Sequence, residues 1–412
     1  MIYRNIQQRL LEALVDTPVV LLHGARQTGK TTLVRAIAEN EHPARYLTFD
    51  DPAVLGAAQS DPQGFIERID GPVVLDEVQR VPELALAIKL SVDRRREPGR
   101  FLLTGSANVL QVPKLSDSLA GRMEIKSLWP FSQGEIGGVR ESFVDAMFAK
   151  RLPKLSEEEK EPALIDRLLV GGYPEVQKRR SSARRREWFT SYINTILQRD
   201  VRDLANIEGL TLMPRLLALL ATRAGALLNF ADVARSIQIP QTTLKRYLAL
   251  LETTFLVQLL EPWHSNLGLR IVKSPKLYIS DCGLLVHLLT TDRERLGSDP
   301  SQLGHVLENF VVTELRKQIS WSKVFAKMYH YRTTTGSEVD IVFAGAGGRI
   351  VGIEVKASAT ISAGDFKGLK ALAEAVGDRF HRGVLLYTGS EALPFGEQMH
   401  ALPVSALWRI GQ

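Results

Sequence analysis

Continuous apolar runs that end in glycine, acidic or hydroxyl residues recur in the first part of the chain. The clearest runs are residues 19–22, 72–75 and 101–103. A strand that is buried on both faces has such an uninterrupted apolar sequence, which is typical of a parallel sheet covered by helices. The segment 30–40 follows the first run and is predicted to be a helix. These patterns predict an α/β domain with its polar loops at the carboxyl ends of the strands.

A different pattern, with apolar residues at helical spacing, begins after about residue 205. Residues 214–224 predict one helix, and Asn229 can cap a second helix that runs to Arg235. A tight turn at 237–241 then leads into a third helix at 242–252. Two helices joined by such a turn are typical of helix-turn-helix proteins.

The third of these helices separates apolar and polar side chains onto two faces. Its predicted buried stripe consists of Leu244, Tyr247, Leu248 and Leu251. Thr243, Lys245 and Arg246 remain outward near the start of the helix, where a recognition helix contacts bases and phosphates. The strand 256–260 and a turn near 264–266 would complete a winged helix. In an ATPase such a module serves either DNA or protein contact, and the sequence leaves both open.

The last third of the chain places acidic and basic residues on strand-like segments. Asp340 lies in the segment 338–342, and Glu354 and Lys356 share one face of the segment 353–356 because side chains alternate along a strand. Glu308 lies on a probable helix upstream. We expect these four polar side chains to converge at one edge of a sheet.

Charge is concentrated in two stretches between these regions. Residues 150–162 are polar and charged, which indicates an exposed connection, and a helical lid is expected to follow. Residues 178–186 are the most basic stretch. They could lie along a phosphate backbone or form an ordinary solvated helix face.

Composition limits the class of protein. With 412 residues, 45% hydrophobic and 24% charged, the chain is expected to be globular with two to four domains. The amino-terminal residues do not resemble a signal peptide and no run is long enough to span a membrane, so we expect a cytoplasmic protein with no membrane partner. The net charge of +6 permits a nucleic-acid partner. The single cysteine, Cys282, cannot form an internal disulfide, which agrees with a reducing compartment. We expect it to be a buried small residue.

The first apolar run leads into a segment that fits the phosphate-binding pattern G-x-x-x-x-G-K-[ST]. Its glycines allow backbone N–H groups to turn toward phosphates, Lys30 would reach the β- and γ-phosphates, and the Thr31 hydroxyl would bind Mg²⁺. No guanine-reading motif accompanies it, which favours ATP over GTP. The expected nucleotide-binding residues are Gly24, Ala25, Arg26, Gln27, Thr28, Gly29, Lys30, Thr31 and Thr32.

The later apolar runs add candidate catalytic residues. Asp76 would hold Mg²⁺ through water, and Glu77 would orient the attacking water or accept its proton, as in a Walker B segment. Thr104 or Ser106, after the third run, could sense the γ-phosphate, although a plain turn explains them as well. Arg122 could act as an arginine finger in its own or a neighbouring subunit of a homo-oligomer, or could be a surface arginine.

These segments resemble the AAA-type ATPases of bacteria and archaea that have a C-terminal domain of unknown function. The resemblance implies a P-loop ATPase fold with ATP as ligand. The segment with Asp340, Glu354 and Lys356 resembles the PD-(D/E)xK nuclease core, with Val339 in place of proline. That resemblance implies that the acids hold Mg²⁺ with help from Glu308, while the lysine positions or activates water. The first resemblance rests on residues 24–32, 75–79, 103–106, 119–122, 171–174 and 198–200.

The sequence therefore predicts a four-part α/β protein. The parts are a P-loop ATPase core at 1–135, a helical lid and linker at 136–205, a winged helix at 206–265 and a PD-(D/E)xK nuclease-like α/β domain at 266–412. We expect Mg²⁺-dependent ATP hydrolysis coupled to nucleic-acid binding and, if the last domain is active, to cleavage. The alternative is a nucleotide-dependent switch that binds another protein and retains an inactive nuclease domain.

Overall fold

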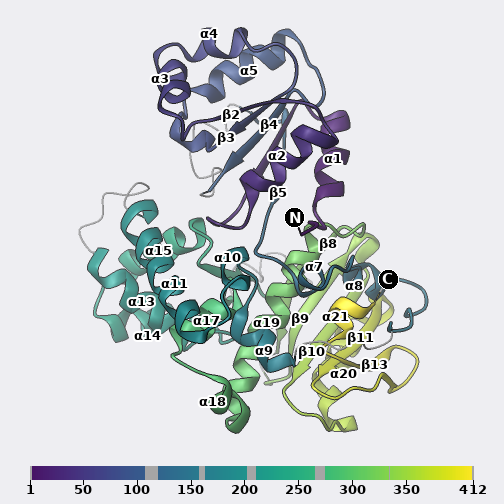
Figure 1. Ribbon diagram of the computed structural model, residues 1–412. Coiled ribbons are helices and arrows are strands. Elements are labelled where there is room, and N and C mark those ends of the chain that lie inside the picture. The colour runs from purple at the N-terminus through teal and green to yellow at the C-terminus, as the bar shows by residue number, and fades with distance from the viewer. Residues whose placement is uncertain are drawn as a thin grey trace. The chain divides into compact units, whose positions relative to one another are not determined.

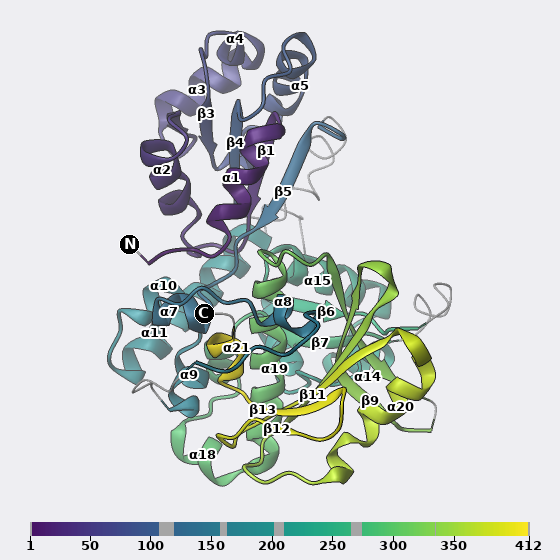
Figure 2. The same cartoon turned by 90° about the vertical axis from the view of Figure 1, so that its right-hand side faces the viewer.

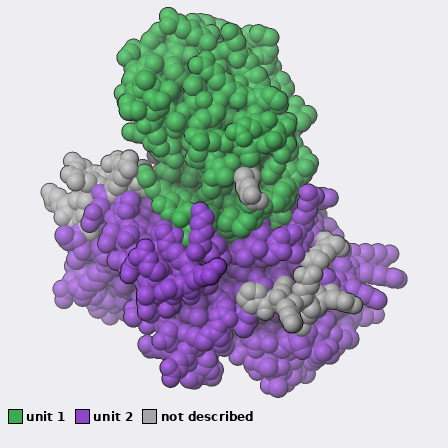
Figure 3. Space-filling model, viewed as in Figure 1, with its two compact units in different colours: residues 1–131, 173–175, 253–255 green, residues 132–172, 176–252, 256–412 purple. Residues whose placement is uncertain are grey.

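The computed structural model divides the chain into two compact units, which Figure 3 colours green and purple. Unit 1 comprises residues 1–131 with the short segments 173–175 and 253–255, and unit 2 contains the remainder. The structure describes residues 2–106, 119–156, 163–201, 210–264, 274–333 and 335–410. In these ranges no helix is both long and apolar enough to cross a lipid bilayer.

Unit 1 is built on a five-stranded parallel sheet with the order β2-β3-β4-β1-β5 (Figure 1). The three strands predicted from apolar runs are buried at every position, so both faces of the sheet are covered. This confirms the predicted parallel α/β organisation. The strands are β1 (Val19–His23), β2 (Arg45–Thr48), β3 (Val73–Asp76), β4 (Phe101–Gly105) and β5 (Met123–Ser127).

Helices with recognisable start signals connect these strands. Helix α2 begins at Lys30, directly after Gly29 in a left-handed conformation, and has the predicted bounds. Asp51 and Asp61 cap the next two helices by accepting hydrogen bonds from backbone N–H groups in their first turns. The helices are α1 (Gln7–Asp16), α2 (Lys30–Asn40), α3 (Pro52–Ser60), α4 (Pro62–Glu67) and α5 (Leu84–Arg94).

The helices expected to form a lid pack mainly within unit 2. Helix α8 packs against α19 (Pro300–Ile319), and α9 packs against α17 (Cys282–Leu288). Their apolar faces therefore complete the core of the C-terminal part of the chain, which local sequence patterns could not reveal. The helices of this region are α7 (Gln133–Gly137), α8 (Phe143–Met147), α9 (Leu164–Val170), α10 (Pro174–Gln177) and α11 (Ser182–Thr195).

The described part of the region predicted to be a winged helix, residues 210–264, contains three α-helices and the strand β6. Asn229 caps α14, as predicted, by accepting a 3.1 Å hydrogen bond from the Asp232 N–H. Strand β6 pairs antiparallel with β7, which lies beyond the predicted boundary at residue 265. Most of the predicted turn near 264–266 falls outside the described residues. The elements are α13 (Met213–Ala221), α14 (Phe230–Ile237), α15 (Gln241–Thr253), β6 (Val257–Leu260) and β7 (Lys276–Ile279).

The rest of unit 2 contains a six-stranded mixed sheet with the order β12-β13-β11-β10-β9-β8. Strands β8, β9 and β10 are antiparallel neighbours, whereas β10, β11 and β13 run parallel. Helix α19 packs against β8 and β10, and α20 (Lys367–Val376) packs against β9, β10 and β11 (Figure 2). The strands are β8 (Ala326–Arg332), β9 (Glu338–Gly345), β10 (Ile350–Lys356), β11 (Phe380–Tyr387), β12 (Leu393–Pro394) and β13 (Met399–Pro403).

Candidate functional site

The phosphate-binding loop connects β1 to α2, and its backbone requires glycine at two positions. Gly24 has φ +154°, and a Cβ atom there would lie 2.1 Å from the carbonyl oxygen of Leu128. Gly29 has φ +93° and immediately precedes α2, so the positive end of this helix faces the loop. A side chain would therefore be unfavourable at both positions, which explains why the motif has glycine there.

Lys30 lies inside this loop. Its Nζ donates hydrogen bonds to the carbonyl oxygens of Gly24 and Ala25, both at 2.9 Å, and the residue is buried. The Thr28 hydroxyl also donates to Ala25 O, at 2.9 Å. An ammonium held by two carbonyl oxygens is well placed to exchange them for phosphate oxygens, because both kinds of oxygen accept its N–H donors.

The carboxylate of Asp76, at the end of β3, is surrounded by hydroxyl groups. Thr31 donates to its Oδ2 at 2.9 Å and Tyr46 at 2.6 Å, while Thr104 donates to Oδ1. Burial raises the pKa of Tyr46, and the hydrogen bond to Asp76 raises it further. Tyr46 was not predicted from the sequence, because a tyrosine on an edge strand carries no motif.

Glu77 follows Asp76 in a left-handed backbone conformation, with φ +63°. A non-glycine residue in this region is uncommon and is concentrated at functional sites. Its backbone N–H donates to the Thr104 hydroxyl at 3.2 Å, and its side chain accepts a hydrogen bond from Gln79. Gln79 also donates to Ser106 at 3.0 Å, so the residues after β3 and β4 form one polar cluster.

Arg122 is held within unit 1 by Asp93 on α5. Its Nε and one terminal nitrogen donate to the two carboxylate oxygens of Asp93 at 2.6 and 3.0 Å. The pair is partly exposed, and the hydrogen bond from Arg122 lowers the pKa of Asp93. The action of Arg122 as an arginine finger stays a prediction.

Two further residues next to the loop were missed by sequence reasoning. Arg4 is buried and donates to Thr28 O at 2.7 Å and to Trp129 O at 2.6 Å. His23 ends β1 and lies 2.7 Å from the Ser127 hydroxyl; burial, aided by the charge of Lys30, lowers its pKa to about 4. Neither residue belongs to the loop motif, so only the tertiary structure associates them with it.

In unit 2, three of the four residues of the predicted nuclease site lie near a lysine that was not predicted. Lys276 Nζ, from β7, lies 2.9 Å from Glu308 Oε1 and 3.1 Å from Asp340 Oδ1. It also lies 2.6 Å from Glu338 Oε1. Glu354, the third predicted residue near this cluster, pairs with Lys356 at 3.2 Å. The predicted convergence of polar side chains is thus observed, but with an additional cation at its centre.

The electrostatics of this cluster follow from burial and proximity. Burial and the neighbouring Asp340 raise the pKa of Glu308 to about 7, against the opposing effect of Lys276. Burial and Asp340 likewise raise the pKa of Glu354 to about 8. Burial alone would lower the pKa of Lys276, but the three surrounding carboxylates outweigh it and raise the pKa.

A divalent metal, which the nuclease resemblance implies, does not fit this arrangement. Among the residues that the structure describes, no three His, Cys, Asp or Glu side chains are placed to hold a metal ion. The expectation that Glu308, Asp340 and Glu354 bind a metal stays a prediction, and this arrangement does not favour it. The physical reason is that Glu308 and Asp340 turn their oxygens to the Lys276 ammonium.

The residues predicted to contact nucleic acid are accessible on α15. Lys245 and Arg246 are exposed and Thr243 is half-buried, whereas the predicted apolar stripe of this helix is buried. Lys245 Nζ lies 5.6 Å from the centre of the Phe230 ring on α14. The helix therefore has the predicted division between its two faces.

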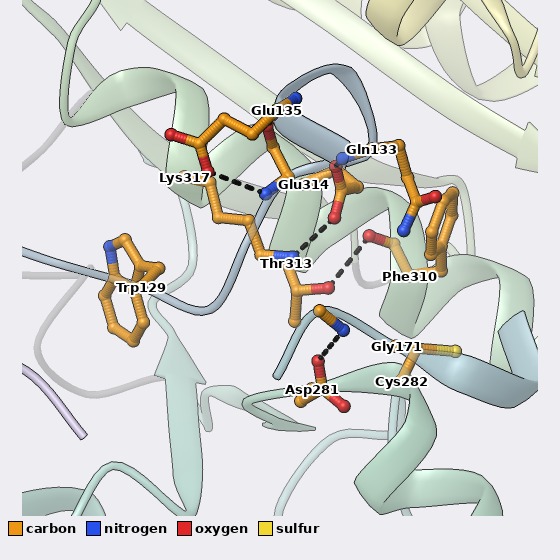
Figure 4. Close-up of polar contacts among 12 residues, drawn as sticks. Trp129, Gln133, Glu135, Gly171, Asp281, Cys282, Phe310, Thr313, Glu314 and Lys317 are labelled. Atoms are coloured by element: carbon orange, nitrogen blue, oxygen red, sulfur yellow. Dashed lines mark hydrogen bonds and ion pairs between the residues drawn. The ribbon is translucent and has the colours of Figure 1, made fainter. Parts of the chain in front are cut away.

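A second buried polar cluster in unit 2 surrounds the start of α7 and was missed by sequence reasoning (Figure 4). Glu314 on α19 pairs with Lys317 at 2.5 Å and accepts the Gln133 N–H at 2.8 Å. Glu141 accepts the Gly134 N–H at 2.9 Å, and Asp281 accepts the Gly172 N–H at 2.7 Å. These carboxylates satisfy buried backbone donors, so we assign them a structural role.

Comparisons with known proteins match three parts of the chain to family models. Family models match residues 16–137 as an AAA domain, 161–295 as a domain of unknown function (DUF8612) and 303–407 as a domain of unknown function (DUF4143). Among solved structures, the RuvB Holliday junction branch migration motor of Thermotoga maritima is 19% identical. It covers 62% of this chain and 88% of its own, with a TM-score of 0.31, too low to support a functional argument.

Relatives match along nearly the whole chain. The uncharacterized proteins Mb2031c of Mycobacterium bovis and Rv2008c of Mycobacterium tuberculosis are each 33% identical over 99% of this chain and 85% of their own length. The uncharacterized protein MJ1544 of Methanocaldococcus jannaschii is 22% identical over 96% of this chain and 88% of its own. The AAA-type part of the predicted resemblance is thereby confirmed. The chain belongs to the same family as Mb2031c and Rv2008c, and its residues 16–137 form an AAA-type P-loop ATPase domain.

Proposed function

We propose that the protein binds ATP with Mg²⁺ in unit 1 and hydrolyses it. The observation that carries this proposal is the 2.9 Å hydrogen bond between the Thr31 hydroxyl and Asp76, which joins the phosphate-binding loop to the end of β3. A hydroxyl and a carboxylate at this place are the oxygen ligands that Mg²⁺ uses when it also binds substrate phosphates. Lys30, already inside the loop, supplies a second positive charge for the phosphates.

The residues around the loop fit a bound Mg²⁺-nucleotide. Thr31 would bind the ion directly and Asp76 through water, and the ion would neutralise phosphate charge. Gly24 and Gly29 have positive φ angles, which let a loop turn its backbone N–H groups toward phosphates. The chemistry therefore depends on residues from α2 and β3, which pack against each other.

Glu77 is the residue we assign to the attacking water. Its carboxylate is oriented by Gln79, and its backbone is held by Thr104 in an uncommon conformation. A carboxylate at this place can orient the water and accept its proton. Gln79 and Ser106 act as positioning residues, because they reach the water only through Glu77.

The direct test is ATP turnover by the full chain with Mg²⁺, compared with the same reaction in EDTA. Lys30→Ala should abolish ATP binding or turnover, while the circular dichroism of the chain stays near that of the parent. Lys154→Ala, which removes an exposed lysine in unit 2, is the matched control and should retain activity. ATP affinity of Lys30→Ala equal to that of the parent contradicts the proposed site.

We further propose a nucleic-acid partner, because the excess of positive charge is concentrated in one short segment of the chain. The chain has 52 Lys and Arg against 46 Asp and Glu, and six of the basic residues lie in the segment 178–186, which has no acidic residue. The remainder of the chain is therefore formally neutral. Lys178, Arg180, Arg184 and Arg186 of this segment are exposed, as are Lys245 and Arg246 on α15. Clustered basic residues on a surface favour a polyanion such as a phosphate backbone.

Turnover measured with and without DNA tests this coupling. Stimulation of ATP hydrolysis by DNA supports a nucleic-acid partner. ATP-dependent oligomerisation of the chain, with little turnover and no DNA binding, supports instead a nucleotide-dependent switch that binds a protein.

A further inference from the structure

Three carboxylates surround the ammonium group of Lys276, as carboxylates would surround a bound metal cation. The ammonium group has three N–H donors, and three carboxylates accept them at 2.6 to 3.1 Å. The acceptors belong to Glu308 on α19 and to Glu338 and Asp340 on β9. The Lys276 side chain is 3% exposed, so this charge lies beneath the surface.

The remaining contacts of the carboxylates are also donors from the chain. Tyr278 donates to Glu308 Oε1 at 2.8 Å, and the Val355 N–H donates to Asp340 Oδ2 at 3.0 Å. Arg332 lies 3.4 Å from Glu338. Together with the ammonium, these contacts use Glu308 Oε1 and both oxygens of Glu338 and of Asp340, which a divalent cation would need as ligands.

Glycine at position 225 provides room for this arrangement. Gly225 has φ +79°, its N–H donates to Leu277 O at 2.7 Å, and a Cβ atom there would approach Glu308 Oε2 to 3.2 Å. The close approach of the backbone lets the segment beside β7 pack directly over the Glu308 carboxylate. The cluster is therefore supported by the backbone as well as by its charges.

We propose that the Lys276 ammonium takes the place of the divalent cation in this nuclease-like site, so that its acids are structural and the wild-type chain does not cleave phosphodiesters there. A second cation at the centre would be repelled by the ammonium at short range in a poorly solvated site. Removal of Lys276 would leave Glu308 and Asp340 close together without this counter-charge, which is unfavourable for buried groups.

The cluster also joins two parts of the chain that match separate family models. Lys276 lies in the part matched at 161–295, whereas the three acids lie in the part matched at 303–407. The lysine on β7 thus connects the two-stranded β6–β7 sheet to α19 and β9. The ion pairs of Lys276 therefore stabilise the packing of β7 against α19 and β9 within unit 2.

The test is to substitute the lysine and supply a metal. Lys276→Met keeps a long apolar side chain but removes the charge, and Mn²⁺ is added as its chloride to the full chain without nucleotide. We expect a lower Tm for Lys276→Met, and an increase of about 5 °C on saturation with Mn²⁺ that the parent lacks. Calorimetric titration should show Mn²⁺ binding at least about tenfold tighter than in the parent.

Two controls make the result specific to this site. Lys276→Met combined with Asp340→Asn should lose the new Mn²⁺ affinity, because a carboxylate ligand is absent. Lys327→Met, which removes an exposed lysine on β8, should gain none. A Lys276→Met chain that folds but gains no affinity for Mn²⁺ overturns the proposal.

A second measurement needs no variant of Lys276. The parent chain should neither bind Mn²⁺ in a manner that depends on Asp340 nor cut single-stranded, double-stranded or branched DNA with Mg²⁺ or Mn²⁺. Cleavage by the parent that Asp340→Asn abolishes, with ATP turnover retained, shows that Lys276 yields to a metal and overturns the proposal.

Discussion

The hydroxyl of Thr31 donates a 2.9 Å hydrogen bond to Asp76, although 45 residues separate the two in the sequence. The contact exists because α2, which follows the loop after β1, packs against β3, which ends in Asp76. The two oxygens that the proposed magnesium site would use are thereby held close together. This preorganisation is the basis of the predictions for unit 1.

Glu77→Gln should allow ATP to bind but slow its hydrolysis by about 100-fold or more, because the water loses its proton acceptor while Thr31 and Asp76 remain. Single-turnover kinetics and retained radiolabelled ATP measure the two effects separately. Glu12→Gln, on an exposed face of α1, is the matched control. Hydrolysis at the parental rate by Glu77→Gln would show that Glu77 has only a structural role.

Arg4→Ala should destabilise unit 1 by about 2 kcal/mol, because it leaves the buried Thr28 carbonyl and the partly buried Trp129 carbonyl without this donor. It should also weaken ATP binding, since Thr28 is part of the loop. Urea unfolding and nucleotide titration report these changes. Arg9→Ala, which removes an exposed ion pair with Glu12, should change stability by less than about 1 kcal/mol. An equal loss of stability in the two variants would contradict the importance of the Arg4 hydrogen bonds.

The stability of unit 1 should fall in acid partly because of His23. Its folded-state pKa is about 4, below the ordinary value of 6.5, so the unfolded chain takes up a proton first as the pH decreases. The contribution is complete above pH 6.5 and is lost progressively as the pH falls through 4, by up to about 3 kcal/mol. Unfolding measured from pH 7 to 4 should be less pH-dependent in His23→Gln. An unchanged pH dependence in that variant contradicts the buried, neutral histidine.

Replacing both Lys245 and Arg246 with alanine should weaken DNA binding and reduce its salt dependence. Each phosphate contact releases counterions, so the loss of two contacts should reduce the slope of log K against log salt by about 2. Fluorescence anisotropy at several salt concentrations measures the slope. The exposed pair Lys367 and Lys370 on α20, replaced in the same way, is the control. An unchanged slope would indicate that α15 contacts a protein.

Local sequence patterns identified the phosphate-binding loop, the three central strands of the first sheet and the buried stripe of α15. Each of these depends on neighbours in the sequence: a glycine before a helix, an apolar run or a helical period. Gly24, Lys30 and Asp76 are therefore identifiable without coordinates. The bounds of α2 follow for the same reason.

Contacts between distant segments were decided only by the tertiary structure. Arg4 reaches Thr28 and Lys276 reaches Asp340 because strands and helices from different parts of the chain pack together, and no local pattern specifies such pairs. The clearest case is the nuclease-like site. Its acids lie together, but a lysine from β7 lies at their centre, and Glu308 and Asp340 turn their oxygens to its ammonium.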